Sequence, residues 1–345
     1  MLRRFRKILT VVLIVLTAVF AIVCYNFYQT FWIKNIDVTE PVYIEIYPEN
    51  SYRDVVQQLA VKGVLENKNT FDWAARVMNY TNAVKPGRYA LKSSISNKQL
   101  IAKLRSGNQD PVRITFNNLR KIDDLAGAIS KQLVFDSLTI LNLLQSDSVA
   151  HSYGFNKETF LCMFVPNTYE FYWTTSAPDF ISKMKKEYDV FWNKDRLAKA
   201  QKLNLNPIEV SILASIVDLE TAKDDEMPRI AGLYWNRLDQ GRKLEADPTV
   251  VFSVGDFNIK RVLNIHLRKD SPYNTYKNNG LPPGPIYLPS VQAINAVLNK
   301  EDHDYLFMCA KDDFSGYHAF AESFSEHKQN ANKFRKALND RKIMK

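Results

Sequence analysis

Several residue patterns are missing from this 345-residue sequence. Its three cysteines (Cys24, Cys162 and Cys309) lie far apart, so they provide neither a disulfide framework nor a cysteine-based metal site. The five histidines show no HExxH-type pattern, and we expect no metal and no cofactor. We find no nucleic-acid-binding motif either. These absences argue against a zinc hydrolase, a disulfide-rich scaffold and a nucleic-acid-binding protein.

Charged residues are absent between Lys7 and Lys34. The stretch is almost wholly apolar from residue 8 to residue 23, and aromatic residues follow it, so we predict a membrane-spanning helix over residues 8–30. Four of the first seven residues are basic, which predicts a cytoplasmic N-terminus and a remainder outside the membrane. A cleaved signal peptide is the alternative. We disfavour it because the run ends in bulky aromatic residues and not in a small-residue cleavage site.

The composition is that of a folded protein with a basic surface. Hydrophobic residues make up 46% of the chain and aromatic residues 12%, while the net charge is +9. The length allows two or three domains. A basic surface suits an anionic polymer or a membrane surface.

A strand-then-helix pattern occurs twice. Residues 42–60 read VYIEIYPENSYRDVVQQLA and residues 112–130 read VRITFNNLRKIDDLAGAIS, so that Val42 aligns with Val112 at an offset of 70. Each copy alternates as a strand does and then takes helical spacing, which predicts two small α+β units. Chance similarity between amphipathic segments is the alternative. In the first unit we also expect a helix over residues 70–80, a turn and strand over 85–91, and a helix over 96–104.

The middle of the chain is mostly helical by its spacing, with helices expected over residues 137–144 and 178–192. Between them, residues 160–173 read FLCMFVPNTYEFYW. This aromatic segment is compatible with a sugar-binding groove, but aromatic residues more often pack in a core.

One helix carries the strongest candidate for catalysis. Residues 207–223 read PIEVSILASIVDLETAK, and a capping box marks the start of the helix. Glu220 follows Ile216 and Val217 on one apolar face, where loss of solvent raises the pKa of a carboxyl group toward that of a general acid. The alternative is that Glu220 ends the helix and turns to solvent. Asp218 falls on a smaller polar face.

The C-terminal region contains further candidates. Asn-Gly and Pro-Pro-Gly turns follow Tyr273, Asn274 and Tyr276 in the same loop and can hold these side chains in fixed positions. We expect helices over residues 228–240 and 290–299, a hairpin formed by residues 305–310 and 317–321, and a final helix that begins near residue 323. His318, on the second strand of this hairpin, could face a cleft.

Taken together, these motifs resemble the YceG-like (MltG) family of endolytic murein transglycosylases. The matching segments are SIVDLETA (215–222), NRL (236–238), ADPTVVF (246–252), PYNTY with GLPPGPI (272–276 and 280–286) and YHAFAESFSEH (317–327). Their order and approximate spacing also match, as do the N-terminal anchor and the KPGRYAL segment of a LysM-like unit. The resemblance covers nearly the whole chain after the anchor, and it is specific because independent motifs agree in order.

The resemblance implies a single-pass protein of the cytoplasmic membrane with its catalytic domain outside. It would cut the MurNAc–GlcNAc bond inside peptidoglycan strands, leave 1,6-anhydro ends and so terminate nascent strands, in contact with peptidoglycan synthases. The family's catalytic glutamate lies in the motif matched by Asp218-Leu219-Glu220, and the helical-face analysis selects Glu220. One departure is that the family's FPDTY-like segment reads VPNTY, so Asn167 can have no acidic role.

We assign candidate roles accordingly. Asp247 could stabilise developing positive charge, although an Asp-Pro pair is as often a plain turn. The residues that we expect to hold the sugars are Asn236, Tyr273, Asn274, Tyr276 and His318. Two alternatives remain: a hydrolase with Asp247 or Asp218 as its second carboxylate, and a non-catalytic peptidoglycan-binding scaffold.

We expect an α+β protein with a single transmembrane helix, LysM-like units and a mainly helical catalytic domain that carries a small β-hairpin. The expected organisation is a cytoplasmic tail (1–7), a transmembrane helix (8–30), a linker (31–41), a LysM-like domain (42–108), an intermediate region (109–195) and a YceG-like catalytic domain (196–345).

Overall fold

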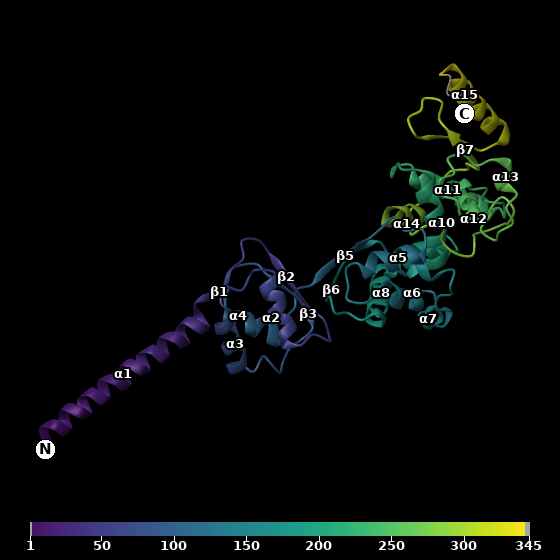
Figure 1. Ribbon diagram of the computed structural model, residues 1–345. Coiled ribbons are helices and arrows are strands. Elements are labelled where there is room, and N and C mark those ends of the chain that lie inside the picture. The colour runs from purple at the N-terminus through teal and green to yellow at the C-terminus, as the bar shows by residue number, and fades with distance from the viewer. Residues whose placement is uncertain (1, 342–345) are drawn as a thin grey trace. The chain divides into compact units, whose positions relative to one another are not determined.

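A computed structural model describes residues 2–341 and forms two compact units (Figure 1). The first unit comprises the chain up to Arg113 together with residues 132–134 and 170–175. The second comprises residues 114–131, 135–169 and the chain from Ser176 on. Helices and small two-stranded sheets make up both units, so the α+β fold class is confirmed.

The first unit begins with the helix α1 (Leu2–Trp32), which Figure 1 shows leading from the N-terminus to β1. The segment Arg3–Trp32 is long and apolar enough to cross a membrane, and its side chains are exposed up to Tyr28. The end of α1 packs against the helices α3 and α4. The elements that follow α1 are β1 (Lys34–Ile36), β2 (Val42–Ile46), α2 (Tyr52–Val61), α3 (Lys68–Val77), β3 (Gly87–Leu91), β4 (Ile95–Ser96) and α4 (Asn97–Ser106).

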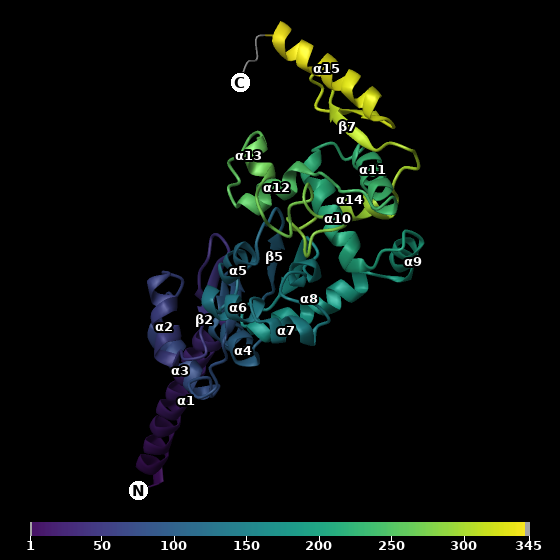
Figure 2. The ribbon, with the colours of Figure 1, turned by 90° about the vertical axis from the view of Figure 1, so that its right-hand side faces the viewer.

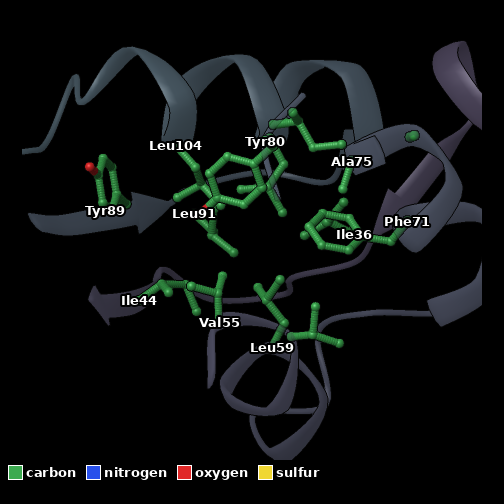
Figure 3. Close-up of a cluster of buried hydrophobic side chains, with 14 of the residues drawn as sticks. Ile36, Ile44, Val55, Leu59, Phe71, Ala75, Tyr80, Tyr89, Leu91 and Leu104 are labelled. Atoms are coloured by element: carbon green, nitrogen blue, oxygen red, sulfur yellow. The ribbon is translucent and has the colours of Figure 1, made fainter. Parts of the chain in front are cut away.

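The core of the first unit lies between the β2–β3 pair and its helices. β2 and β3 are antiparallel, with Val42 opposite Leu91. Figure 3 shows Ile44 from β2, Leu59 from α2 and Leu104 from α4 pointing into one cluster, and all three are fully buried. The alternation of β2 thus follows the predicted pattern, in which every second side chain enters the core.

The expectation of a linker over residues 31–41 is wrong. β1 lies within it and pairs with β4, while Ile36 is fully buried and Phe31 is nearly so. The Asn97 side chain donates a hydrogen bond of 2.9 Å to the Thr30 carbonyl at the end of α1. A three-residue strand gives too short a pattern to be recognised in the sequence.

The predicted repeat is confirmed at the level of secondary structure. β2 and α2 are followed, 70 residues later, by β5 (Val112–Phe116) and α5 (Ile122–Ser130). β5 pairs with β6 (Asn167–Phe171), and the boundary between the two units falls within these two strands.

The second unit is mainly helical. Besides part of β5 and β6, its elements are α5, α6 (Ser137–Leu144), α7 (Asp147–Ser152), the 3₁₀ helix η1 (Phe160–Met163), α8 (Ala177–Phe191), α9 (Lys194–Lys202), α10 (Pro207–Glu220), α11 (Met227–Asp239), α12 (Asp247–Val254), α13 (Asn264–Leu267), α14 (Val291–Leu298), β7 (Phe307–Ala310), β8 (His318–Ala321) and α15 (Phe324–Asp340). The predicted helices and the β7–β8 hairpin are present within a few residues. The helix α12 was not predicted.

α10 lies at the centre of the second unit. Its residues from Val210 to Val217 are all buried, and it packs against α11, α12 and α14 (Figure 2). Most aromatic residues of the segment before it belong to the core, since Phe160 and Phe164 are buried and Tyr169 is 6% exposed, whereas Tyr172 is 58% exposed. Core packing, not a sugar groove, therefore accounts for the buried aromatic residues.

Candidate active site

The start of α10 is fixed by a capping box. The Asn206 side chain accepts hydrogen bonds from the backbone nitrogens of Ile208 and Glu209, at 2.9 and 3.0 Å. Glu209 in turn accepts one from the Asn206 nitrogen, at 2.8 Å. These bonds satisfy donors that would otherwise lack partners, as the sequence predicted.

The polar face of α10 holds the loop that precedes α14. The Ser215 hydroxyl accepts a hydrogen bond of 3.1 Å from the Ile286 nitrogen. Asp218 accepts one of 2.6 Å from the Ser290 nitrogen and one of 3.1 Å from the Ser290 hydroxyl. Burial raises the pKa of Asp218, although the two bonds from Ser290 oppose this shift. Asp218 thus supports the start of α14.

Glu220 is the last residue of α10 and turns toward α11. The Tyr234 hydroxyl donates a hydrogen bond of 2.5 Å to its Oε1. Burial raises the pKa of Glu220 to about 7, the hydrogen bond from Tyr234 lowers it, and the nearby negative charge of Asp247 raises it. Glu220 can therefore hold or release a proton near neutral pH, as a general acid–base requires.

Glu220 lines a cavity of about 200 Å³ in the second unit. Of the residues predicted from the sequence, Asp247, Tyr276 and His318 line the same cavity. α12 contributes Asp247, the loop after α13 contributes Tyr276 and β8 contributes His318. The tertiary structure thus brings four candidates together from segments almost a hundred residues apart.

Asp247 and Tyr276 form a pair in this cavity. The Tyr276 hydroxyl donates a hydrogen bond of 2.7 Å to Oδ1 of Asp247, which holds the exposed carboxylate in one orientation. Burial and the charge of Asp247 raise the pKa of Tyr276, so the phenol stays protonated.

A buried carboxylate holds the hairpin strand β8 beside α10. Glu226, 3% exposed, accepts hydrogen bonds from the His318 backbone nitrogen at 2.7 Å and from the Thr221 hydroxyl at 3.0 Å. The ring nitrogen Nδ1 of His318 lies 2.9 Å from Oε2 of Glu226. This network fixes the position of His318 relative to the residues just after Glu220.

Three predicted sugar-binding residues lie outside the lining of this cavity. The Asn236 amide donates to the carbonyls of His303 and Tyr305, at 2.6 and 3.1 Å. Asn274 is fully buried, and its amide donates to two backbone carbonyls, those of Leu267 and Lys269. Both amides therefore hold loops. Tyr273 lines a different cavity. Substrate contacts by these three residues stay a prediction.

Tyr234 and Arg237 also hold this site together, although neither was predicted from the sequence. Arg237, 7% exposed, donates to the Leu306 carbonyl at 2.6 Å, and it donates to the Leu244 carbonyl and to Glu245, each at 2.9 Å. It thereby joins α11 to the segments that lead into α12 and β7. The helical spacing could have indicated both residues, because Tyr234 and Arg237 follow Ile230 at i+4 and i+7 and so lie on the buried face of α11.

No group of three or more histidine, cysteine, aspartate or glutamate side chains that could hold a metal ion lies within residues 2–341.

The chain is thus an α+β protein whose helical unit holds a glutamate with a raised pKa in a polar cavity, together with a second carboxylate. The sequence model of the YceG-like family matches residues 44–333. The chain belongs to this family.

Individual relatives agree with this assignment. An endolytic murein transglycosylase of Bacillus subtilis (strain 168) is 28% identical over 325 residues, which cover 88% of each chain. One of Streptococcus pneumoniae (strain R6) is 27% identical over 334 residues, which cover 86% of this chain and 59% of the relative. The chain thus spans about three fifths of the pneumococcal protein. A yceG-like protein from Listeria monocytogenes, known from a crystal structure, has a TM-score of 0.55 and 28% identity, and the match covers 85% of this chain and 99% of that one.

Proposed function

We propose that this protein is an endolytic peptidoglycan transglycosylase with Glu220 as its catalytic acid and base. The observation that carries the proposal is the Glu220 carboxyl, whose pKa is raised to about 7 in a polar cavity beside Asp247. The names of the relatives from Bacillus and Streptococcus support the substrate and the reaction.

The proposed reaction needs one proton-transferring residue. Protonated Glu220 gives its proton to the glycosidic oxygen as the bond from C1 of the muramic acid breaks. The Glu220 carboxylate then takes the proton of the C6 hydroxyl of the same sugar, and that oxygen closes onto C1 to form the 1,6-anhydro end. Since the nucleophile belongs to the substrate, holding the sugar in place supplies much of the rate.

Asp247 has an electrostatic role in this proposal. Its carboxylate, oriented by Tyr276, would stabilise the positive charge that develops at C1. The same position also favours one alternative, a hydrolase in which Asp247 activates water as the second carboxylate. Asp218 is less suited to that role because Ser290 occupies both of its oxygens.

The test is the digestion of purified peptidoglycan by the full-length protein in detergent, because residues 30–36 pack into the first unit. Glu220→Gln is assayed beside it, and the products are read by mass spectrometry. We expect internal fragments with anhydro ends, and a loss of activity of about 10²- to 10⁴-fold in Glu220→Gln. The matched control is Glu66→Gln, which changes an exposed glutamate of the first unit and should leave the rate unchanged.

The other outcomes separate the alternatives. Products that carry an added water would establish hydrolysis. Unchanged activity in Glu220→Gln would overturn the assignment of the catalytic residue. Glycan binding without cleavage by the folded parent protein would support the scaffold alternative.

The membrane anchor and domain plan belong to the same proposal. α1 would cross the cytoplasmic membrane with the N-terminus inside, and the catalytic unit would lie outside. The contacts of Phe27 and Phe31 with Trp73, with ring centroids 5.8 and 5.6 Å apart, would hold the first unit close to the membrane. Protease digestion of intact spheroplasts tests this orientation: it should degrade the second unit and spare an epitope tag added to the N-terminus.

The proposed domains are a LysM-like peptidoglycan-binding domain over residues 42–108, an intermediate region over 109–195 and the catalytic domain from residue 196. In the cell, cleavage close to the membrane would terminate growing strands, with a peptidoglycan synthase as partner. Chemical cross-linking in the membrane fraction tests for such a partner. The amount of synthase cross-linked to the parent protein is compared with the amount cross-linked to Glu220→Gln, to show whether the contact depends on cleavage.

A further inference from the structure

A second cavity of about 470 Å³ lies in the same unit as Glu220. Two aromatic residues, Phe252 and Tyr273, line it together with three cations, Arg120, Lys121 and Lys157. Aromatic rings beside convergent charges are typical of a built ligand site. Neither the acid–base chemistry of Glu220 nor the residues that hold it make use of this cavity.

The cations of this cavity have no ion-pair partner among the residues that the structure describes. None of Arg120, Lys121 and Lys157 forms an ion pair in the part of the chain that the structure describes. The Arg120 guanidinium lies 4.6 Å from the ring centroid of Phe257 and 5.9 Å from that of Tyr287. A guanidinium stacked on rings is held in position while its N–H edges stay free to bind a carboxylate.

The aromatic side of the cavity is rigid. The rings of Phe252 and Tyr273 lie 4.8 Å apart, and Phe252 also packs against Phe257 at 6.4 Å. A Cβ atom on Gly284 would meet the carbonyl of Glu158 and lie 3.1 Å from the Tyr273 hydroxyl. The Pro-Pro-Gly turn therefore packs closely behind Tyr273 and fixes the ring.

Two segments contribute to both cavities. α12 carries Asp247 of the first cavity and Phe252 of the second, five residues or about 7.5 Å apart along the helix. The loop after α13 carries Tyr276 of the first and Tyr273 of the second. Because a cavity of about 200 Å³ is smaller than the usual site for one small molecule, a polymer bound there must extend over neighbouring surface.

We propose that the second cavity binds the carboxylate-bearing stem peptide of the peptidoglycan strand while the sugar chain occupies the Glu220 cavity. This inference rests on the proposed function. Arg120 and Lys121 bind the peptide carboxylates. Asp123 and Glu158, which also line the cavity, suit the amino group of such a peptide. The cavity thus distinguishes strands that carry peptides from strands that have lost them.

The experiment compares two soluble ligands, glycan oligomers that carry stem peptides and the same oligomers stripped by an amidase. Their affinities are measured by calorimetry in Glu220→Gln protein, which does not consume them. We expect the added change Arg120→Gln with Lys121→Gln to weaken binding of the peptide-bearing oligomer at least about tenfold more than binding of the stripped oligomer. That factor corresponds to the loss of one charge-assisted hydrogen bond.

Controls separate a specific effect from general damage. Arg120→Lys keeps the charge and loses the planar fork, so it should show an intermediate loss. Lys194→Gln with Lys202→Gln removes two exposed charges elsewhere in the second unit and should leave both affinities unchanged. Equal weakening of both ligands, or no weakening, would overturn the inference. Because the measurement is binding, it stands apart from cleavage by the parent protein, which tests the proposed function.

Discussion

The Tyr234 hydroxyl donates a hydrogen bond of 2.5 Å to Oε1 of Glu220. This contact joins the end of α10 to the middle of α11. It is one of two opposing influences on the pKa of the Glu220 carboxyl group. Burial and the charge of Asp247 favour the protonated form of Glu220, whereas the bond from Tyr234 favours the ionised form. The balance, a pKa of about 7, lets the same group give a proton and then take one.

The pH dependence of cleavage should report this pKa. Below pH 7 Glu220 keeps its proton, and above it the acid is lost, so we expect kcat/KM to fall about tenfold per pH unit on the alkaline side. The measurement is the initial rate on peptidoglycan between pH 5 and 9. A profile that is flat across pH 7 would contradict the role of Glu220 as the acid.

Ionisation of Glu220 should also reduce stability. Its folded pKa lies above the ordinary value of 4.5, so the loss of stability is absent below that value and complete above pH 7. Glu220→Gln should therefore match the parent at low pH and equal or exceed it in free energy of unfolding at pH 8. Urea unfolding at both pH values checks this, and lower stability of the variant at pH 8 would contradict it.

Replacing Tyr234 should move the alkaline limb of the pH–rate profile, the part in which the rate falls as Glu220 ionises, to higher pH. Tyr234→Phe removes the hydrogen bond that lowers the pKa of Glu220, so we expect the limb to shift to higher pH by on the order of one unit. The pH–rate profile is the measurement. Tyr172→Phe, which changes an exposed tyrosine, is the matched control, and a shift to lower pH in Tyr234→Phe would refute the assignment.

Replacing Asp247 should move the same limb in the opposite direction. Asp247→Asn removes a negative charge that raises the pKa of Glu220, so the limb should shift to lower pH. We also expect a reduced rate on the acid side, where Glu220 remains protonated, because Asn cannot stabilise positive charge. Asp304→Asn, at an exposed position, should change neither quantity. An unshifted limb would show that the two carboxylates do not interact.

Asp218 should matter for stability and not for the pH profile. Asp218→Ala leaves the Ser290 nitrogen at the start of α14 without its partner, so we expect the free energy of unfolding to fall by about 1–3 kcal/mol. Asp224→Ala, at an exposed position nearby, should change it by less than about 0.5 kcal/mol. Denaturant unfolding is the measurement. Loss of all cleavage in folded Asp218→Ala would favour Asp218 as a catalytic residue.

Gly232 marks a close approach between α11 and the segment before β7. A Cβ there would overlap the Glu301 carbonyl and the His303 ring, so Gly232→Ala should lower the free energy of unfolding by about 1–3 kcal/mol. Gly127, in α5, has nothing near its missing Cβ. Gly127→Ala should therefore be stabilising by up to about 1 kcal/mol, and equal effects at both sites would contradict this explanation.

Local sequence patterns predicted most of the helices and strands, because a helix cap, a turn or a periodic run of apolar residues is encoded within a few adjacent residues. Adjacent residues were enough to predict the capping box before α10 and the hairpin strands β7 and β8. The same holds for the helix α15, which Ser323 caps. α12 escaped prediction because its Asp-Pro start reads equally as a turn. β1 escaped because three residues carry too little alternation.

The family motifs, the anchor-length helix and the position of Glu220 on the apolar face of α10 can all be read from the order of the residues. The polar residues around Glu220 could be identified only from the folded chain. It placed Tyr234 and Asp247 beside Glu220 and used Asn236 and Asn274 to hold loops. The physical reason is that a helical pattern shows which face is buried, whereas the pKa of a buried carboxyl depends on partners that only the packing of distant segments brings within a few ångströms.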